Sequence, residues 1–241
     1  MPSSSTTACM ILLTFLGTSL AAEEIAIPLP KDGAWARYHV TTTHEADTRN
    51  QTSTRNETIK FVGTAVSDGV RHRWIEQSFG GFEDRTTNVM KTLVAEKVLN
   101  SAWPLAAERR WWHKMGDQPV KEVGTLGPEY GVFSLVFPGS YNTAKPLKEA
   151  RTIEYQRGRL EIQEGLAGRQ DISLQNNAEN IRFEIEYKVW RHPNVPLGIA
   201  AAKISLRTHE FGSLNPRETY TTEFALEDCG TDAKTSLPEK N

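Results

Sequence analysis

Residues 181–190, IRFEIEYKVW, decide the fold of this chain of 241 residues. Their apolar side chains fall at every second position, and charged side chains fill most of the positions between them. This period of two is typical of a β-strand that buries one face and exposes the other to water. A helix of the same sequence would spread its apolar residues around the whole circumference.

The same alternation recurs along the chain and predicts an antiparallel sheet. Further strands are expected at residues 34–43, 59–66, 70–79, 86–94, 199–206 and 217–227. Gly158 predicts a tight hairpin within residues 151–162, because glycine readily adopts the positive φ that such turns need. The triplet Ser67-Asp68-Gly69 predicts a second hairpin, since these residues are typical of turns.

Two stretches in the middle of the chain predict short helices instead. Residues 104–115, PLAAERRWWHKM, begin with a proline, which the first turn of a helix tolerates, and end before Gly116. Residues 128–136 predict a second short helix. The expected fold class is therefore α+β, with two helices that cover part of a mostly antiparallel sheet.

Residues 1–21 predict a secretory signal peptide. They carry no charged side chain, and an apolar run at residues 10–16 is followed by small residues. We favour cleavage after Ala21, and cleavage after Ala22 is the alternative. The apolar run is too short to span a bilayer, so we expect a periplasmic or secreted protein without a permanent membrane span. Residues 22–241 are expected to form a single, mostly antiparallel β domain.

Cysteine content and charge narrow the function classes. Cys9 precedes the apolar run, so it is badly placed to become a lipidated N-terminus. Removal of the leader would leave Cys229 without a partner for an intramolecular disulfide. The formal net charge is −2, from 28 basic and 30 acidic residues, and this balance gives no basic footprint for nucleic acid.

No motif in the sequence names a reaction. The six histidines, His39, His44, His72, His113, His192 and His209, form no HExxH pattern, and we expect no metal site. We find no GxSxG turn and no complete nucleotide-binding motif, so we expect no catalytic residues and no cofactor. A non-enzymatic protein is the favoured interpretation. The alternative is an extracytoplasmic hydrolase whose site is assembled from distant residues.

Two polar segments have competing interpretations. Residues 108–114, ERRWWHK, fit a helix that contacts anionic groups, or a helix whose tryptophans plug one end of the sheet. We favour the second interpretation. Residues 41–57 are interpreted as a polar loop, in which Asn50 and Asn56 are formal glycosylation acceptors.

Several short motifs resemble those of a loose family of uncharacterised exported bacterial proteins. They are GAWARY at residues 33–38, RWIE at 73–76, KTLVAEKVL at 91–99, VPLG at 195–198 and CGTDAK at 229–234. In the order of its elements, the chain more distantly resembles the LolA and LolB lipoprotein carriers. That resemblance implies a curved sheet that forms an incomplete barrel, with helices that cap a concave face able to accept acyl chains.

The resemblance also implies a cavity for a hydrophobic ligand. The expected signal peptide, the alternating strands, the helix pair and the lack of a catalytic motif favour a protein that binds a lipid, another apolar ligand or an envelope protein in the concave sheet. The candidate ligand-binding residues on that face are Tyr38, Phe61, Trp74, Ile185, Tyr187, Trp111 and Trp112. A structural component of the envelope is a further alternative.

A proline-bracketed segment separates two of the expected strands. It reads VWRHPNVPLGIA at residues 189–200 and contains Pro193 and Pro196. Proline has no N–H to donate to a sheet, so the chain must leave the ladder here. The residue before each proline is biased toward extended conformations. We therefore predict a rigid corner that joins two antiparallel strands at the rim of the sheet.

Overall fold

The structure is a computed structural model, and it describes residues 29–46, 49–67, 69–80, 87–96, 110–115, 119, 121–123, 144–175, 180–210 and 213–237. Its strands are β1 (Trp35–Ala46), β2 (Arg49–Ser67), β3 (Val70–Gly80), β4 (Thr87–Ala95), β5 (Arg110–Met115), β6 (Lys121–Val123), β7 (Lys145–Leu147), β8 (Arg151–Tyr155), β9 (Gly158–Ile162), β10 (Gly165–Gln175), β11 (Asn180–Arg191), β12 (Ile199–Glu210) and β13 (Glu218–Gly230).

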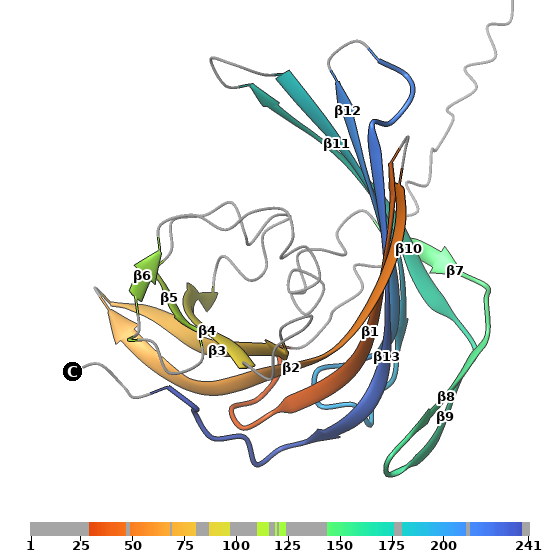
Figure 1. Cartoon of the computed structure of the whole chain (residues 1–241). Helices are drawn as coiled ribbons and strands as arrows, with labels where there is room; N and C mark the ends of the chain where they lie inside the picture. Colours follow the sequence, from red (N-terminus) through yellow and green to blue (C-terminus); the bar gives the residue numbers. More distant parts are fainter. Residues whose placement is uncertain are drawn as a thin grey trace, which may run out of the picture.

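Eleven of these strands form one antiparallel sheet in the order β6-β5-β4-β3-β2-β1-β13-β12-β11-β10-β7. Strands β8 and β9 form a separate hairpin. Over the described residues, β6 and β7 do not pair with each other, so the sheet is not closed into a barrel. Figure 1 shows that it is strongly curved, with a concave and a convex face. The prediction of a curved, mostly antiparallel sheet is therefore confirmed.

The hairpin β8–β9 lies on the convex side of the sheet (Figure 1) and identifies that face. Trp190 of β11 donates its indole N–H to the carbonyl of Glu149 at 2.9 Å, just before the hairpin. The guanidinium of Arg151 in β8 lies 4.5 Å from the centre of the Trp190 ring. Side chains alternate between the two faces along a strand. Since Trp190 points to the convex side, Val189 and Tyr187 both point to the concave side.

The C-terminal segment, residues 231–237, runs across the convex side toward β3 and gives a second marker of that face. The carboxylate of Glu76 accepts the backbone N–H of Ser236 at 2.8 Å and that of Leu237 at 3.4 Å. It also accepts the hydroxyl of Thr235. We call residues 231–237 the C-terminal strap, because it fastens the end of the chain to the middle of the sheet.

Both predicted hairpins and the proline corner are confirmed. The turn between β8 and β9 ends at Gly158, whose φ is 140°, and Gly69, with a φ of 74°, lies between β2 and β3. Residues 192–198 connect β11 to its antiparallel neighbour β12. Three backbone hydrogen bonds hold this corner together, from His192 to Gly198, from Val195 to His192 and from Gly198 to Val195.

Two expectations from the sequence are wrong. Residues 110–115, expected in a helix, form β5, which pairs with β4 from Leu93 to Asn88. Residues 44–46 and 49–57, expected in a loop, lie in β1 and β2, which pair along the whole length of β1. The rest of the first predicted helix and the whole of the second, residues 128–136, lie outside the described residues. Among the described residues, no helix is long and apolar enough to cross a membrane.

Candidate functional site

The concave face near the proline corner is an apolar floor built by four adjacent strands. Val189, Ala202, Phe224 and Val40 lie opposite one another in the ladders of β11, β12, β13 and β1. Each of these side chains is at most 2% exposed. These four residues, which we call the floor, pair across the strands because the alternation of each strand places an apolar side chain at the same level.

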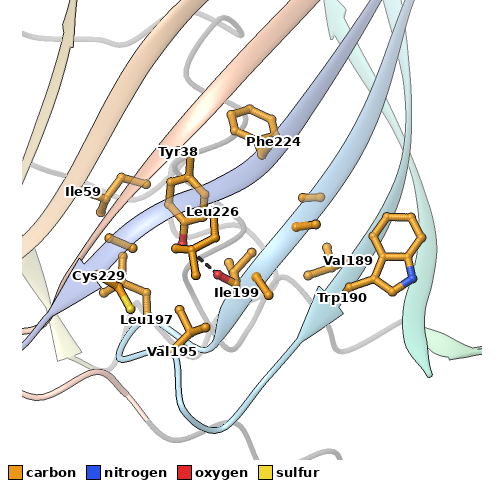
Figure 2. Close-up of a cluster of buried hydrophobic side chains, with 14 of the residues drawn as sticks. Tyr38, Ile59, Val189, Trp190, Val195, Leu197, Ile199, Phe224, Leu226 and Cys229 are labelled. Carbon is orange, nitrogen blue, oxygen red and sulfur yellow. Dashed lines mark hydrogen bonds between the residues drawn. The ribbon is translucent and has the colours of Figure 1, made fainter. Parts of the chain in front are cut away.

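Tyr38 connects this floor to the proline corner. Its ring meets that of Phe224 edge-on, with the ring centres 6.4 Å apart. Its hydroxyl donates to the carbonyl of Ile199 at 3.1 Å, as the dashed line in Figure 2 marks. A buried tyrosine hydroxyl needs such a partner, since an unpaired one would carry a desolvation cost. Tyr38 is thus part of the packed core.

Farther from the corner, the same concave face is less covered. Ile185, Leu206, Tyr220 and His44 again lie opposite one another across β11, β12, β13 and β1, but all four are only half-buried. We call these four residues the open end. The open end therefore continues the floor as a partly exposed surface.

Of the polar groups at the open end, the Tyr220 hydroxyl is hydrogen-bonded, whereas His44 Nε2 has no hydrogen-bond partner among the described residues. The ring of His44 stacks on that of Tyr220 with the ring centres 4.3 Å apart. The Tyr220 hydroxyl donates to a carboxylate oxygen of Glu218 at 3.1 Å. Partial burial, reinforced by this carboxylate, raises the pKa of Tyr220 above its usual value. The hydroxyl therefore stays protonated, and the open end presents aromatic and aliphatic surface.

On β2, β3 and β4 the concave face carries a polar stripe formed by Glu57, Gln77 and Thr92, each at most 4% exposed. Gln77 Nε2 donates to Glu57 Oε1 at 2.6 Å, and Arg55 Nη2 lies 3.2 Å from Glu57 Oε2. Burial raises the pKa of Glu57, although Arg55 and Gln77 oppose that shift. Within the described part of the chain, Gln77 Oε1 and Thr92 Oγ1 have no hydrogen-bond partner.

The structure places four of the seven candidate ligand-binding residues on the concave face. Tyr38, Phe61 and Tyr187 are buried there, and Ile185 belongs to the open end. Trp74 lies on the convex face instead, where the ammonium of Lys91 is 4.8 Å from its ring centre.

The two remaining candidates are consecutive residues of β5. Trp111 pairs with Thr92 and Trp112 pairs with Lys91 in the ladder between β4 and β5. Sequence reasoning did not single out Leu206 or the polar stripe. Leu206 could have been found from the alternation of residues 199–206, whereas nothing in the local sequence marks Glu57 for burial.

Among the described residues, one buried histidine lies close to a carboxylate. It is His209, which lies near Glu184 on the convex face. His209 Nε2 is 3.9 Å from Glu184 Oε2. This is longer than the roughly 3 Å that direct proton transfer requires. Arg207 and Arg169 hold the same carboxylate at 2.5 Å and 2.9 Å. The charge of Glu184 is thus neutralised by arginines, an arrangement typical of a structural ion cluster.

Other groups that could support chemistry are equally constrained. Cys229 is buried, and that burial raises the pKa of its thiol, which lowers its reactivity as a nucleophile. No group of three or more His, Cys, Asp or Glu side chains in the described ranges is arranged to hold a metal ion.

Comparison with known proteins gives similarity to solved structures only. No protein-family model matches the chain. No curated protein matches its sequence. The chain is similar to a DUF1329 family protein from Desulfovibrio piger, with 8% identity, a TM-score of 0.33, and 84% of this chain and 87% of that chain covered.

Two further structures are similar at the same level. One, from Bacteroides fragilis, is provisionally described as an exported protein with a YmcC-like fold; the identity is 10%, the TM-score 0.32, and the match covers 84% of this chain and 97% of that one. The other, from Vibrio parahaemolyticus, is provisionally described as an outer membrane lipoprotein-sorting protein domain, with 10% identity, a TM-score of 0.33, and 87% and 89% covered.

Proposed function

We propose that this is an exported, non-enzymatic protein that binds the apolar part of a lipid or a similar ligand on its concave face. The observation that supports this most directly is the continuity of the floor with the open end. From the floor to the open end, the inward side chains of β11 and β12 are apolar throughout, and they pass from buried near the proline corner to half-exposed farther along. On β13 and β1 the hydrogen-bonded pair Thr222 and Thr42 lies between the floor and the open end. A partly exposed apolar surface that continues a core is typical of a binding site.

The chemistry of the open end supports an apolar partner. Ile185, Leu206 and Tyr220 present aliphatic and aromatic surface from three adjacent strands. Covering such surface with hydrocarbon gains about 25 cal/mol for each Å² removed from water. The signal peptide predicted at residues 1–21 would deliver the domain to the envelope, where lipids and lipidated proteins are the abundant apolar partners.

Native mass spectrometry of the protein isolated from the envelope of its expression host tests the proposal. We expect a bound lipid mass on the wild-type protein. Leu206→Gln should remove it, because a polar amide would then interrupt the apolar surface. The matched control is Ser205→Gln, which changes the adjacent, half-buried residue on the opposite face of the same strand. Absence of lipid from the wild type, or equal loss from both variants, would contradict the proposed site.

A further inference from the structure

A pocket of about 840 Å³ lies at the rim of the sheet, between the proline corner and the segments that begin β1 and β10. This volume falls in the range of roughly 300–1,000 Å³ typical of small-molecule sites. The pocket is separate from the open end, because its lining comes from residues 29–31, 34, 146, 164–166, 191–198 and 231.

The walls of the pocket are largely apolar. They include Leu29, Pro30, Leu166, Pro193, Val195 and Pro196. Val195 is 3% exposed and packs into the core on its other side, next to Leu197 in Figure 2. The pocket wall is thus supported from behind by the core of the sheet.

The proline corner forms one wall of the pocket and is held rigid without a bound ligand. Two prolines fix φ within it, and the three backbone hydrogen bonds described above close the turn. Gly198 has a φ of 74°, and a Cβ at this position would collide with the guanidinium of Arg191. Arg191 Nε donates to the Gly198 carbonyl at 3.3 Å, so the guanidinium lies across the turn. A preformed wall reduces the entropy lost on binding.

The polar groups around the pocket are mainly hydrogen-bond donors. Lys31 and Arg191 contribute two positive charges, against the single carboxylate of Glu164. His192 also lines the pocket, and its Nδ1 accepts the backbone N–H of Asn194 at 3.2 Å. The neutral His192 ring therefore carries its proton on Nε2 and acts there as a further donor.

From these observations we infer that the rim pocket is a second ligand site, which takes a single-chain amphiphile with an anionic head such as a carboxylate. The hydrocarbon chain lies against the proline and leucine walls. The head group accepts hydrogen bonds from the donors around Arg191 and His192, since charge-assisted bonds to a carboxylate are the strong ones. This site is independent of the ligand proposed for the concave face.

Calorimetric titration of the full protein with decanoate, and with 1-decanol as the uncharged counterpart, tests the inference. We expect one saturable site for decanoate and at least fivefold weaker binding of 1-decanol. Asn194→Trp should weaken decanoate binding at least tenfold, because an indole at this exposed position of the corner fills the pocket. The matched control is Asn215→Trp, which places the same side chain in another exposed loop and should change binding less than twofold.

A second pair of variants tests the charge without altering the pocket's shape. Lys31→Gln should weaken decanoate binding severalfold, whereas Lys203→Gln, on the convex face, should not. No decanoate binding to the wild type, equal binding of 1-decanol, or full binding to Asn194→Trp would overturn the inference. If Leu206→Gln abolishes decanoate binding and Asn194→Trp does not, the hydrocarbon chain of decanoate binds at the open end and not in the rim pocket. The rim site then fails while the proposed function stands.

Discussion

Strands β2–β4 and strands β11–β13 line the same concave face, but they line it with different chemistry. Across β11–β13 the inward positions are mostly apolar, with Thr208, Thr222 and Glu218 as the exceptions, and they pass from the buried floor to the half-exposed open end. Across β2–β4 the polar stripe of Glu57, Gln77 and Thr92 interrupts the apolar rows and is itself buried.

The difference shows why the two halves suit different tasks. Apolar side chains can be left half-exposed at modest cost and then be covered by a ligand. A buried carboxylate needs partners at all times, because an unpaired one carries a large desolvation penalty. We therefore expect ligand contacts to be concentrated on β11–β13, and β2–β4 to contribute chiefly to the fixed core.

The largest effect should come from removing a fully buried ring in either half. We expect Phe61→Ala in β2 and Phe224→Ala in β13 each to lower the free energy of unfolding by about 3–5 kcal/mol, through lost apolar contact and the resulting cavity. Urea denaturation measures both. Val66→Ala is the control, since Val66 is 72% exposed, and it should change stability by less than about 0.5 kcal/mol. A large loss for one ring alone would show that the two halves do not share one cooperative core.

The next effect should come from the polar stripe. Gln77→Met keeps the volume of the side chain but removes the 2.6 Å hydrogen bond to Glu57. We expect a loss of about 1–3 kcal/mol, because Arg55 is then the one partner that the described residues still offer to the buried carboxylate. Combining this change with Glu57→Leu should cost less than the sum of the two single changes. Additive costs in that double-mutant cycle would show that the two side chains are not coupled.

The extent of the sheet could be predicted only where burial is one-sided. Residues 181–190 alternate cleanly, and β11 forms there with Tyr187 and Val189 on the buried side. Residues 41–57 carry polar side chains on both faces, so no hydrophobic period marks the β1–β2 pairing. Those strand ends are held by the backbone ladder and by cross-strand contacts such as Thr43 to Thr52, whose hydroxyl oxygens are 3.3 Å apart.

The candidate site could be predicted in part for the same reason. The alternation of residues 181–190 placed Ile185 and Tyr187 on one face, because period two fixes the face of each side chain. In β5, the adjacent tryptophans hide any period of two, and the pairing with β4 overrides the helical pattern of the local sequence. The burial of Glu57 depends on Gln77, twenty positions away on β3, and such non-local contacts leave no local signal.

A smaller effect on stability should come from the ionisation of Glu57, and it should depend on pH. Burial raises the pKa of Glu57 in the folded state above the value of 4.5 usual for glutamate. An acid whose pKa is higher in the folded than in the unfolded state stabilises the folded protein fully at pH values below its unfolded-state pKa. This stabilisation is lost as the pH rises through its folded-state pKa. The stability of the wild type relative to Glu57→Gln should therefore decrease as the pH rises from 4 toward neutrality. Urea denaturation of both proteins across this range measures the difference, and a relative stability that rises with pH would contradict the assigned direction.

The smallest effect on stability should come from the open end, where it is also most informative. Ile204 and Leu206 lie on the same face of β12, but Ile204 is 8% exposed and Leu206 is half-buried. We expect Ile204→Ala to cost about 2–4 kcal/mol and Leu206→Ala less than about 1 kcal/mol, because the removed methyl groups of Leu206 already contact water. Thermal unfolding of the lipid-free protein measures both losses. If Leu206 is a binding residue, repeating the measurement with bound lipid should enlarge the cost of Leu206→Ala, since a ligand that binds the native state stabilises it in proportion to its affinity. An equal cost with and without lipid would mean that the open end is simply a thinly covered edge of the core, and the contrast between the two halves would then concern stability alone.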